Sequence, residues 1–217
     1  PFRAYLLRID SEKAEIRNGA EAQAIKKDLA SLPFSVRQIE RKERRKNPPP
    51  PYITSQLQQE AWRKLRFTAK KTMSIAQRLY EGIEIGQEGP VGLITYMRTD
   101  SVRIAPEALT AVRQFIQEKY GAEYLPEKPN YYKSRKTAQE AHEAIRPTST
   151  FREPEAVQRL LSRDQHRLYT LIWQRMVASQ MADARYDVTT ADIEAKPTSG
   201  RDAYLMRATN TQMVFPG

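Results

Sequence analysis

The chain has 217 residues, of which 40% are apolar and 29% charged, and it contains no cysteine. The lack of cysteine excludes disulfide bonds and thiolate metal sites, and no apolar run is long enough to cross a bilayer. The net charge of +10 favours a polyanionic partner such as nucleic acid. A membrane surface is the rival partner, but no segment reads clearly as a basic amphipathic helix with aromatic anchors.

The beginning of the chain is predicted to form strands. Residues 5–9 and 13–16 have the pattern of two short strands, and apolar residues in 20–30 recur at helical spacing. A longer strand is predicted over 34–46. It must stop at Asn47 and the four prolines that follow, because proline cannot continue a hydrogen-bonded ladder.

The middle of the chain is predicted to be helical. Ser55 and Gln58 have the spacing of a capping box for a helix over 55–65, and a second helix over 69–80 ends at Gly82.

Three more helices are predicted further on. One covers 106–121, and a short one opens with Thr137 and Glu140 and is closed by Pro147. The longest late helix, over 163–181, opens with a capping box of Ser162 and Gln165.

Strands return after Asp183. Residues 185–193 and 203–209 have the composition of strands, and 197–200 that of the turn between them. The sequence therefore predicts an α+β protein in which a mainly helical domain, 56–182, is inserted into a discontinuous β-rich domain made of 1–55 and 183–217.

Tyr96 and Arg98 are the first candidates for chemistry. A tyrosine can attack a phosphodiester if a fixed cation balances the charge that develops on the phosphate. In an extended segment, residues two apart leave the same face, so Arg98 is placed to do this. On chemistry alone, a tyrosine near an arginine is more often a surface packing pair.

His142 and Arg146 are the second pair of candidates. At four residues apart on the predicted helix they share a face, although a histidine in a helix is more often a surface or capping residue. His166, the only other histidine, has no motif around it and is interpreted as structural.

Two basic stretches are candidates for DNA contact. Arg63, Lys64 and Arg66 lie along one predicted helical flank and are suited to backbone phosphates. Just ahead of His142, Lys133 and Arg135 follow two tyrosines, and this mixture of rings and cations suits a single strand. A solvated loop is an equally good interpretation of the second stretch.

Three segments resemble motifs of the bacterial type IA DNA topoisomerases. They are 92–101 (GLITYMRTDS), 137–147 (TAQEAHEAIRP) and 54–61 (TSQLQQEA). Their order along the chain is the order found in that family. The resemblance is specific over about residues 47–182 and rests only on strand pattern at the two ends. It implies a β-rich arch that carries an inserted helical domain.

The resemblance also implies roles for residues. Tyr96 is the expected nucleophile, which forms a 5′-phosphotyrosine link to a cut single strand. Arg98 is expected to place the phosphate, and His142 to assist proton transfer. Thr99, Asp100 and Arg146 are expected to bind DNA, with Arg146 bracing its helix as the alternative.

The resemblance further implies partners and a cofactor. The expected substrates are single-stranded and negatively supercoiled DNA, in the cytoplasm at the bacterial nucleoid. Mg²⁺ is expected on a separate N-terminal toprim domain, because this sequence has no Asp-x-Asp metal motif. No metal is expected in this chain, which is interpreted as a central fragment with little cleavage activity alone.

Two rival functions remain open. In one, the chain is a non-enzymatic single-stranded DNA-binding module and Tyr96 only stacks a base. In the other, it is a tyrosine recombinase or a type IB enzyme. Those enzymes place an Arg-His-Arg set before a C-terminal tyrosine, whereas here Tyr96 precedes His142 and Arg146.

Overall fold

The computed structural model describes residues 2–85, 89–133, 142–196 and 203–217. The chain forms two compact units, described separately below: a β unit of Pro1–Lys46 and Ala184–Pro216, and a helical unit of Asn47–Asp183 with Gly217. The helices together with an antiparallel sheet confirm the predicted α+β class. Residues 47–55, which the sequence analysis assigned to the β-rich domain, belong to the helical unit.

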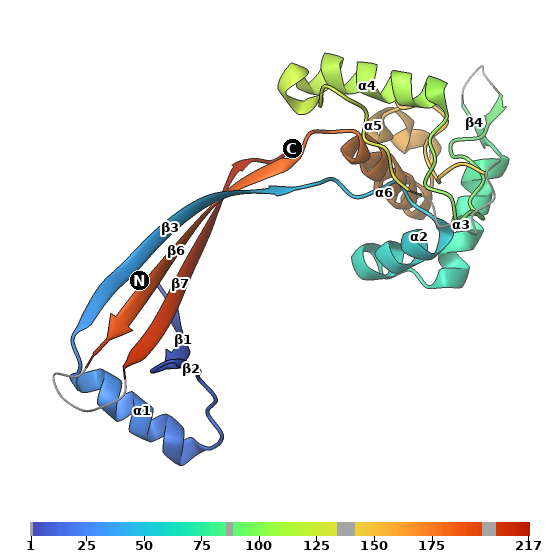
Figure 1. The fold of residues 1–217 in the computed structure, drawn as a ribbon. Coiled ribbons are helices and arrows are strands. Elements are labelled where there is room, and N and C mark those ends of the chain that lie inside the picture. The colour runs from blue at the N-terminus through green and yellow to red at the C-terminus, as the bar shows by residue number, and fades with distance from the viewer. Residues whose placement is uncertain (1, 86–88, 134–141, 197–202) are drawn as a thin grey trace. The chain divides into compact units, whose positions relative to one another are not determined.

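The β unit is built on one antiparallel sheet with the strand order β2-β1-β7-β6-β3. Figure 1 shows β3, β6 and β7 running side by side. The elements of this unit are β1 (Ala4–Ile9), β2 (Glu12–Lys13), α1 (Gly19–Ser31), β3 (Phe34–Lys46), β6 (Ala184–Ala195) and β7 (Tyr204–Phe215). The last strand runs beyond the predicted 203–209, because it pairs with β6 along its whole length.

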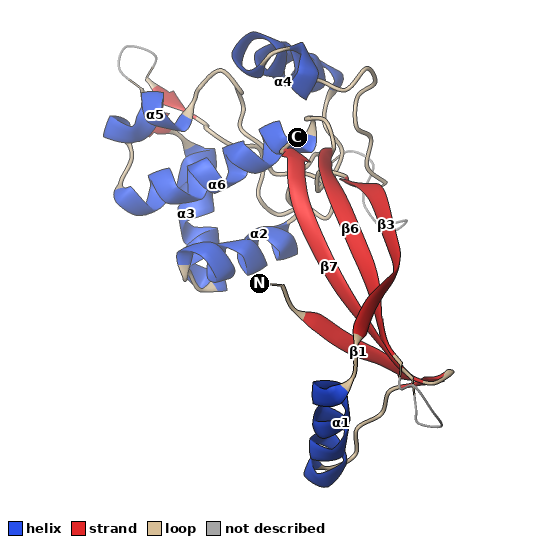
Figure 2. Cartoon of the chain, turned by 90° about the vertical axis from the view of Figure 1, so that its left-hand side faces the viewer, coloured by secondary structure: helices blue, strands red, loops and turns tan. Residues whose placement is uncertain are grey.

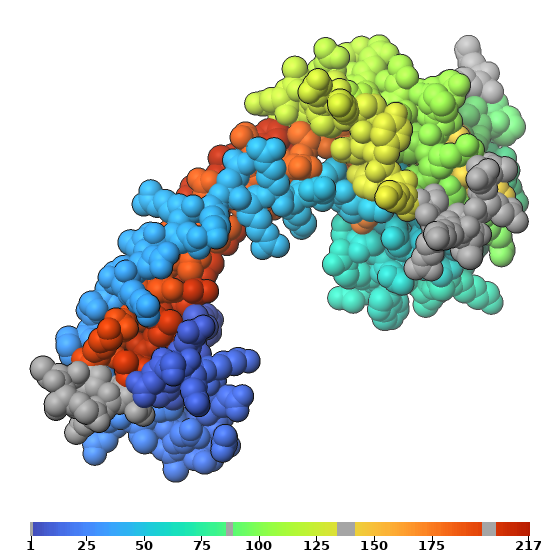
Figure 3. All heavy atoms as spheres, in the orientation of Figure 1, coloured from blue at the N-terminus to red at the C-terminus, as the bar shows by residue number. Residues whose placement is uncertain are grey.

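The core of the β unit is small and lies under helix α1. Asn18 caps this helix by accepting a hydrogen bond from the Glu21 backbone N–H, which satisfies one of its free donors. The buried cluster contains Ile25, Ile193, Ala195, Tyr204 and Met206. Every residue of β3 is exposed, and its side chains form the light-blue surface of the sheet in Figure 3.

The helical unit packs around α6, a helix of 17 residues (Arg163–Ser179). Leu168, Ile172 and Met176 on this helix are fully buried, and Figure 2 shows the other helices gathered around it. The other elements of the unit are α2 (Thr54–Glu60), η1 (Ala61–Leu65), α3 (Ala69–Glu81), β4 (Ile83–Glu84), β5 (Pro90–Val91), α4 (Pro106–Tyr120), η3 (Ala122–Tyr124), α5 (Pro154–Val157) and η4 (Gln158–Leu160).

Helix ends follow local chemistry in some places and distant contacts in others. The predicted capping box of Ser162 and Gln165 is confirmed at the start of α6. The one predicted at Ser55 and Gln58 is wrong, because α2 starts at Thr54 and its N-cap residue, Ile53, makes no side-chain hydrogen bond. The predicted helices over 69–80 and 106–121 match α3 and α4 closely.

The predicted helix over 137–146 is corrected by the structure. Its capping residues Thr137 and Glu140 lie outside the described residues, but 142–147 contain no helix. This segment is extended, with isolated bridges from Ile145 to Tyr52 and from Pro147 to Ile94. His142 and Arg146 therefore do not share a helical face.

Candidate active site

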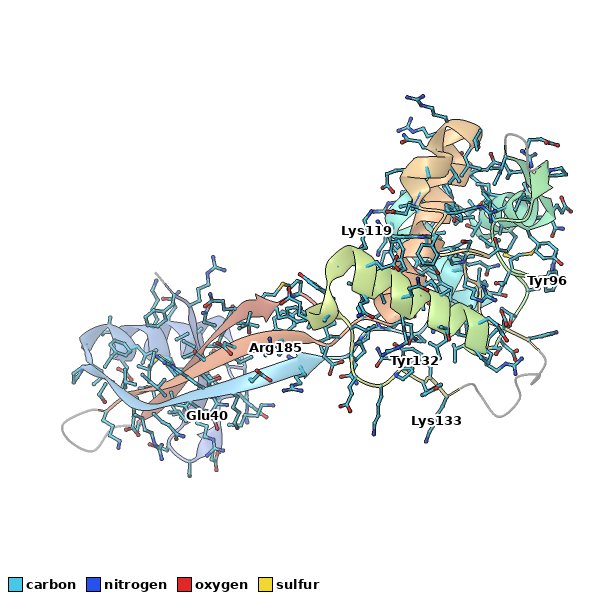
Figure 4. The ribbon with its side chains drawn as sticks, turned by 90° about the horizontal axis from the view of Figure 1, so that it is seen from above. Glu40, Tyr96, Lys119, Tyr132, Lys133 and Arg185 are labelled. Atoms are coloured by element: carbon cyan, nitrogen blue, oxygen red, sulfur yellow. The ribbon has the colours of Figure 1, made fainter. Side chains whose placement is uncertain are left out.

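Tyr96 lies on a non-helical segment whose side chains alternate between surface and core. Tyr96 is 44% exposed, and Arg98 and Asp100 are exposed as well. Between them, Met97 and Thr99 are buried. Tyr96 and Arg98 are therefore both presented to solvent, as expected for an extended segment, and Figure 4 shows Tyr96 at the edge of the helical unit.

Thr54, in another of the sequence motifs, holds one end of the Tyr96 segment. Its backbone N–H donates to the carbonyl of Thr99 at 2.9 Å. Its hydroxyl donates to the carbonyl of Met97 at 2.8 Å and accepts from the Thr99 N–H at 2.8 Å. These bonds connect Thr54 to backbone groups that are 43 and 45 residues further along the chain. They therefore fix the segment on both sides of Arg98.

The described part of the 137–147 motif holds the other end of the segment. The Thr95 N–H donates to the carbonyl of Arg146 at 2.9 Å, and the Thr95 hydroxyl donates to the carbonyl of Ala144 at 2.7 Å. The Ile145 N–H in turn donates to the carbonyl of Tyr52 at 2.8 Å. The fold thus brings together the described parts of the three motif segments around Tyr96.

Helix α3 supports the segment just before Tyr96. The Leu93 N–H donates to the carbonyl of Leu79 at 2.7 Å. Gly92 lies so close that an added Cβ would come within 2.7 Å of the Tyr80 carbonyl oxygen. The ring of Tyr80 meets that of Tyr96 edge-on, with centroids 5.3 Å apart and planes at 64°.

The predicted phosphate-handling residues differ in their surroundings. Within the described part of the chain, Arg98 is exposed and has no ion pair. His142 is half-buried. The side chain of Arg146 is only 12% exposed and donates from Nε and Nη2 to Glu143 at 2.9 and 2.6 Å. In this structure the Arg146 guanidinium is hydrogen-bonded to neighbours on its own segment, Glu143 and Pro147.

The two residues after Arg98 also differ. The buried hydroxyl of Thr99 accepts the Ser101 N–H at 3.0 Å, so it stabilises the turn from inside the protein. Asp100 is exposed.

The predicted basic positions are exposed where the structure describes them. Arg63 and Lys64 pair with Glu60 at 2.7 and 3.5 Å. Partial burial opposes ionisation of this carboxyl, but hydrogen bonds and charge from the two cations lower the pKa of Glu60. Arg66 ends η1 in a left-handed conformation with φ of 61°. Lys133 is exposed and points outward in Figure 4, and Arg135 lies outside the described residues.

Tyr132 has a structural setting that the sequence did not reveal. Its hydroxyl lies 2.7 Å from the carbonyl oxygen of Ser179 and 3.1 Å from that of Pro48. Burial raises the pKa of Tyr132 to about 12, so the phenol remains a donor. Tyr131 beside it is 80% exposed. His166, interpreted as structural, contacts the carbonyl of Pro154 through Nε2 at 3.1 Å.

Sequence reasoning missed four residues that shape the site: Thr54, Tyr80, Gly92 and Thr95. Thr54 and Thr95 lie inside quoted motifs, but their partners are more than 40 residues away. Tyr80 was placed only as the last residue of the helix predicted over 69–80. A single sequence contains no signal for such long-range bonds, so these residues became visible only in the fold.

The described residues show neither a metal-binding cluster nor a membrane-spanning helix. Among the described residues, no group of three or more histidine, cysteine, aspartate or glutamate side chains is arranged to hold a metal ion. In the same part of the chain, no helix has both the length and the apolar character to cross a membrane.

Comparison with known proteins places this fold and site in a family. A model of the DNA topoisomerase family matches residues 5–217. The chain is 48% identical to DNA topoisomerase 1 of Xylella fastidiosa, with all of this chain and 27% of the relative aligned. It is 45% identical to DNA topoisomerase 1 of Rickettsia felis, with 100% and 28% aligned.

A solved structure agrees with these sequence matches. Full-length topoisomerase I from Thermotoga maritima superposes with a TM-score of 0.75 and 37% identity, over 95% of this chain and 32% of that one. The chain belongs to the DNA topoisomerase family, and its identification as a type IA member is confirmed. It spans about 27% of the length of the curated relatives that it matches.

Proposed function

We propose that this chain supplies the nucleophile of a type IA topoisomerase and that Tyr96 is that nucleophile. The phenol oxygen attacks a phosphodiester of single-stranded DNA, the bond from phosphorus to the 3′ oxygen breaks, and a 5′-phosphotyrosine link forms. The 3′ oxygen leaves with a proton. The reverse attack restores the strand, so religation needs no ATP.

One observation carries this proposal: an exposed phenol on a segment that is fixed from two sides. The segment is held on either side of Tyr96, because Thr54 donates hydrogen bonds to the carbonyls of Met97 and Thr99, and Thr95 donates to the carbonyls of residues 144 and 146. Such preorganisation lowers the cost of placing a reacting group. Relaxation of negatively supercoiled DNA by strand passage would follow in the whole enzyme.

Neighbouring residues have supporting roles in the same proposal. Arg98, exposed on the same segment, balances the charge that develops on the phosphate. His142 assists the proton transfer. The DNA backbone is bound by four exposed cations: Arg63, Lys64, Arg66 and Lys133. The pairs of Arg63 and Lys64 with Glu60 do not prevent this, because both cations are exposed in these pairs and surface ion pairs are weak.

The proposal includes a metal and a partner domain. Acidic residues of an N-terminal domain of the same enzyme would hold Mg²⁺, and the ion would supply positive charge near the phosphate. Meanwhile Tyr96 and Arg98 of this chain present the phenol and bind the phosphate. Action on nucleoid DNA in the bacterial cytoplasm belongs to the same proposal.

The test is the formation of a covalent adduct in a full-length protein. This chain would replace the matching segment of the X. fastidiosa relative, which aligns with it over 223 residues. Single-stranded oligonucleotides labelled at the 3′ or the 5′ end are incubated with Mg²⁺ and resolved on a denaturing gel. A 5′-phosphotyrosine link retains only the 3′ label, whereas a type IB enzyme or a recombinase would retain the 5′ label.

Tyr96→Phe is the matched control, because it removes only the hydroxyl. We expect the adduct to disappear in this variant while non-covalent binding is kept. Arg98→Ala should slow adduct formation by about 100-fold or more. An adduct that survives Tyr96→Phe would disprove the assignment of the nucleophile.

The second candidate function is a single-stranded DNA-binding module. It is favoured by Tyr131, which is 80% exposed beside the exposed Lys133, because bases stack on such rings. A folded full-length protein that binds the oligonucleotide but never forms an adduct would support this alternative over catalysis.

A further inference from the structure

We propose that Tyr80 is a positioning residue for Tyr96: its ring holds the Tyr96 ring in the orientation from which the phenol oxygen attacks. This inference rests on the proposed function, in which Tyr96 is the nucleophile. It gives a role in the reaction to a residue of helix α3 that lies outside all three sequence motifs.

The contact between the two rings has the geometry of an attractive pair. Their centroids are 5.3 Å apart and their planes are inclined by 64°, within the edge-to-face range that aromatic pairs prefer. Tyr80 is 40% exposed and Tyr96 44% exposed. Neither ring is enclosed by the core, so each is an important lateral support of the other.

Tyr80 is itself anchored firmly to the Tyr96 segment. The Leu93 N–H donates to the carbonyl of Leu79 at 2.7 Å, one residue before Tyr80. The backbone of Gly92 approaches the carbonyl oxygen of Tyr80 more closely than any residue with a Cβ could do without a shift. The last turn of α3 and the strand that leads to Tyr96 are therefore held in fixed register, and the two rings are brought together by backbone geometry.

Orientation matters because the attack must occur in line with the leaving oxygen. A tyrosine on an exposed segment has several χ1 rotamers open to it, and only some direct the phenol oxygen at a bound phosphate. By excluding rotamers, Tyr80 raises the fraction of Tyr96 side chains that are ready to react. This predicts an effect on the rate of attack and not on DNA affinity.

The kinetic test uses the same full-length protein and varies only Tyr80. Tyr80→Leu should lower the rate of adduct formation at saturating oligonucleotide by about 3- to 10-fold, the factor that corresponds to the usual strength of an aromatic pair. The oligonucleotide concentration for half-maximal rate should change by less than about twofold. Tyr80→Phe keeps the ring and should restore the rate to nearly that of the parent protein.

Tyr120→Leu is the matched control. Tyr120 is 38% exposed and is also in edge-on contact with another ring, that of Phe115 at 6.2 Å. It lies at the end of α4, and its ring contacts are with Phe115 and Tyr124. If the Tyr120 variant slows the reaction as much as the Tyr80 variant, the effect is general destabilisation and the inference fails.

Further outcomes would also overturn the inference. An unchanged rate in Tyr80→Leu, or a Phe variant as slow as the Leu variant, would exclude positioning by the ring. A loss confined to DNA affinity would make Tyr80 a binding residue. If the parent protein forms no adduct that depends on Tyr96, the proposed function itself fails, which is a different result from a reactive parent that is insensitive to Tyr80.

A second measurement examines the ring contact in this chain by itself. In NMR spectra of the chain with labelled tyrosine rings, Tyr80→Leu should remove the ring-current shift that the edge-on neighbour imposes on Tyr96. Tyr120→Leu should leave the Tyr96 signals in place. A Tyr96 ring signal that is identical in the parent and in Tyr80→Leu would show that the rings are not in contact in solution.

Discussion

The two units of the chain reach stable structure by different means. The helical unit has a broad core that includes the fully buried Leu57, Leu79 and Ile172. The β unit has a small cluster at one end and a long strand, β3, that is exposed throughout. In the β unit, long antiparallel ladders of hydrogen bonds, each interrupted by one register shift, define the fold. In the helical unit, packing holds irregular segments in place, and the candidate site around Tyr96 lies on one of these segments.

This contrast explains where Tyr96 is found. An irregular segment such as 92–103 has backbone groups that no helix or ladder satisfies, and they must find other partners. Here those partners are side chains and carbonyls of distant segments. The same bonds that satisfy the backbone also fix Tyr96. A regular strand would not need such distant partners, because its neighbours in the sheet satisfy its backbone groups.

The largest expected effect comes from opening a cavity in the helical unit. Ile172→Ala, at a fully buried position, should lower the free energy of unfolding by about 2–5 kcal/mol. Ile39→Ala, on β3 where Ile39 is 59% exposed, should change it by less than about 0.5 kcal/mol. Both tryptophans, Trp62 and Trp173, lie in the helical unit, so their fluorescence during urea unfolding reports that unit.

Amide hydrogen exchange along β6 would follow the β unit in the same samples. If the Ile172 and Ile39 substitutions lowered the free energy of unfolding equally, the contrast between the two units would be contradicted.

A smaller loss is expected from Gly92→Ala. The added methyl group would lie 2.7 Å from the Tyr80 carbonyl oxygen, and relieving this clash should cost about 1–3 kcal/mol. Gly19→Ala is the control, because Gly19 starts α1 with nothing within 4 Å of an added Cβ. Thermal unfolding of both variants measures the difference. A Gly92 variant as stable as the Gly19 variant would show that the close approach is easily relaxed.

The smallest effect concerns one ion pair of the β unit and depends on pH. Arg207 donates to both carboxylate oxygens of Asp192, at 2.7 and 2.9 Å. These hydrogen bonds lower the pKa of Asp192 below its ordinary value of 3.8. Since the folded state binds this proton less readily than the unfolded state, the pair stabilises the fold above the ordinary pKa. That stability is lost as the pH falls through the depressed pKa.

The comparison with Asp192→Asn tests this pH dependence. The parent chain should be slightly more stable than the variant at pH 7, and the difference should vanish in strong acid. Amide exchange along β6, with urea unfolding from pH 7 to pH 2, measures it. A difference that is the same at every pH, or that grows in acid, would show that the Asp192 carboxylate does not stabilise the β unit.

Local chemistry was predictable from the sequence, and long-range hydrogen bonding was not. Ser162 and Gln165 cap α6 as predicted, because both partners lie within one turn. Ser55 and Gln58 have the same spacing, but α2 begins one residue earlier, with the Thr54 hydroxyl bonded to the distant Met97 and Thr99. Likewise, the predicted helix that includes Arg146 gives way to an extended segment, whose N–H groups reach Tyr52 and Thr95.

The candidate site shows the same division. The motif around Tyr96 identified the exposed phenol and the alternation that presents Arg98 with it. Periodicity along 69–80 predicted α3 but gave Tyr80 no role beyond one helical face. The contact between the Tyr80 and Tyr96 rings depends on the close approach of the Gly92 backbone to the Tyr80 carbonyl oxygen. The sequence also gave no sign that the Thr99 hydroxyl would accept a hydrogen bond inside the protein, and it left open whether Arg146 binds DNA or has a structural role.

The hydroxyl of Tyr132 lies within hydrogen-bonding distance of the carbonyls of both Pro48 and Ser179. It therefore links the two ends of the segment that connects β3 to β6. In the β unit, Lys46 pairs directly with Ala184, so the whole of 47–183 occupies the place of a hairpin loop between β3 and β6. A flexible loop of that length would carry an entropic cost of closure. A folded insert whose own ends are held near each other largely avoids that cost. The helical unit therefore occupies the position of a hairpin loop, and its own folding holds the two ends of the insert close together, at the spacing that the paired residues Lys46 and Ala184 require.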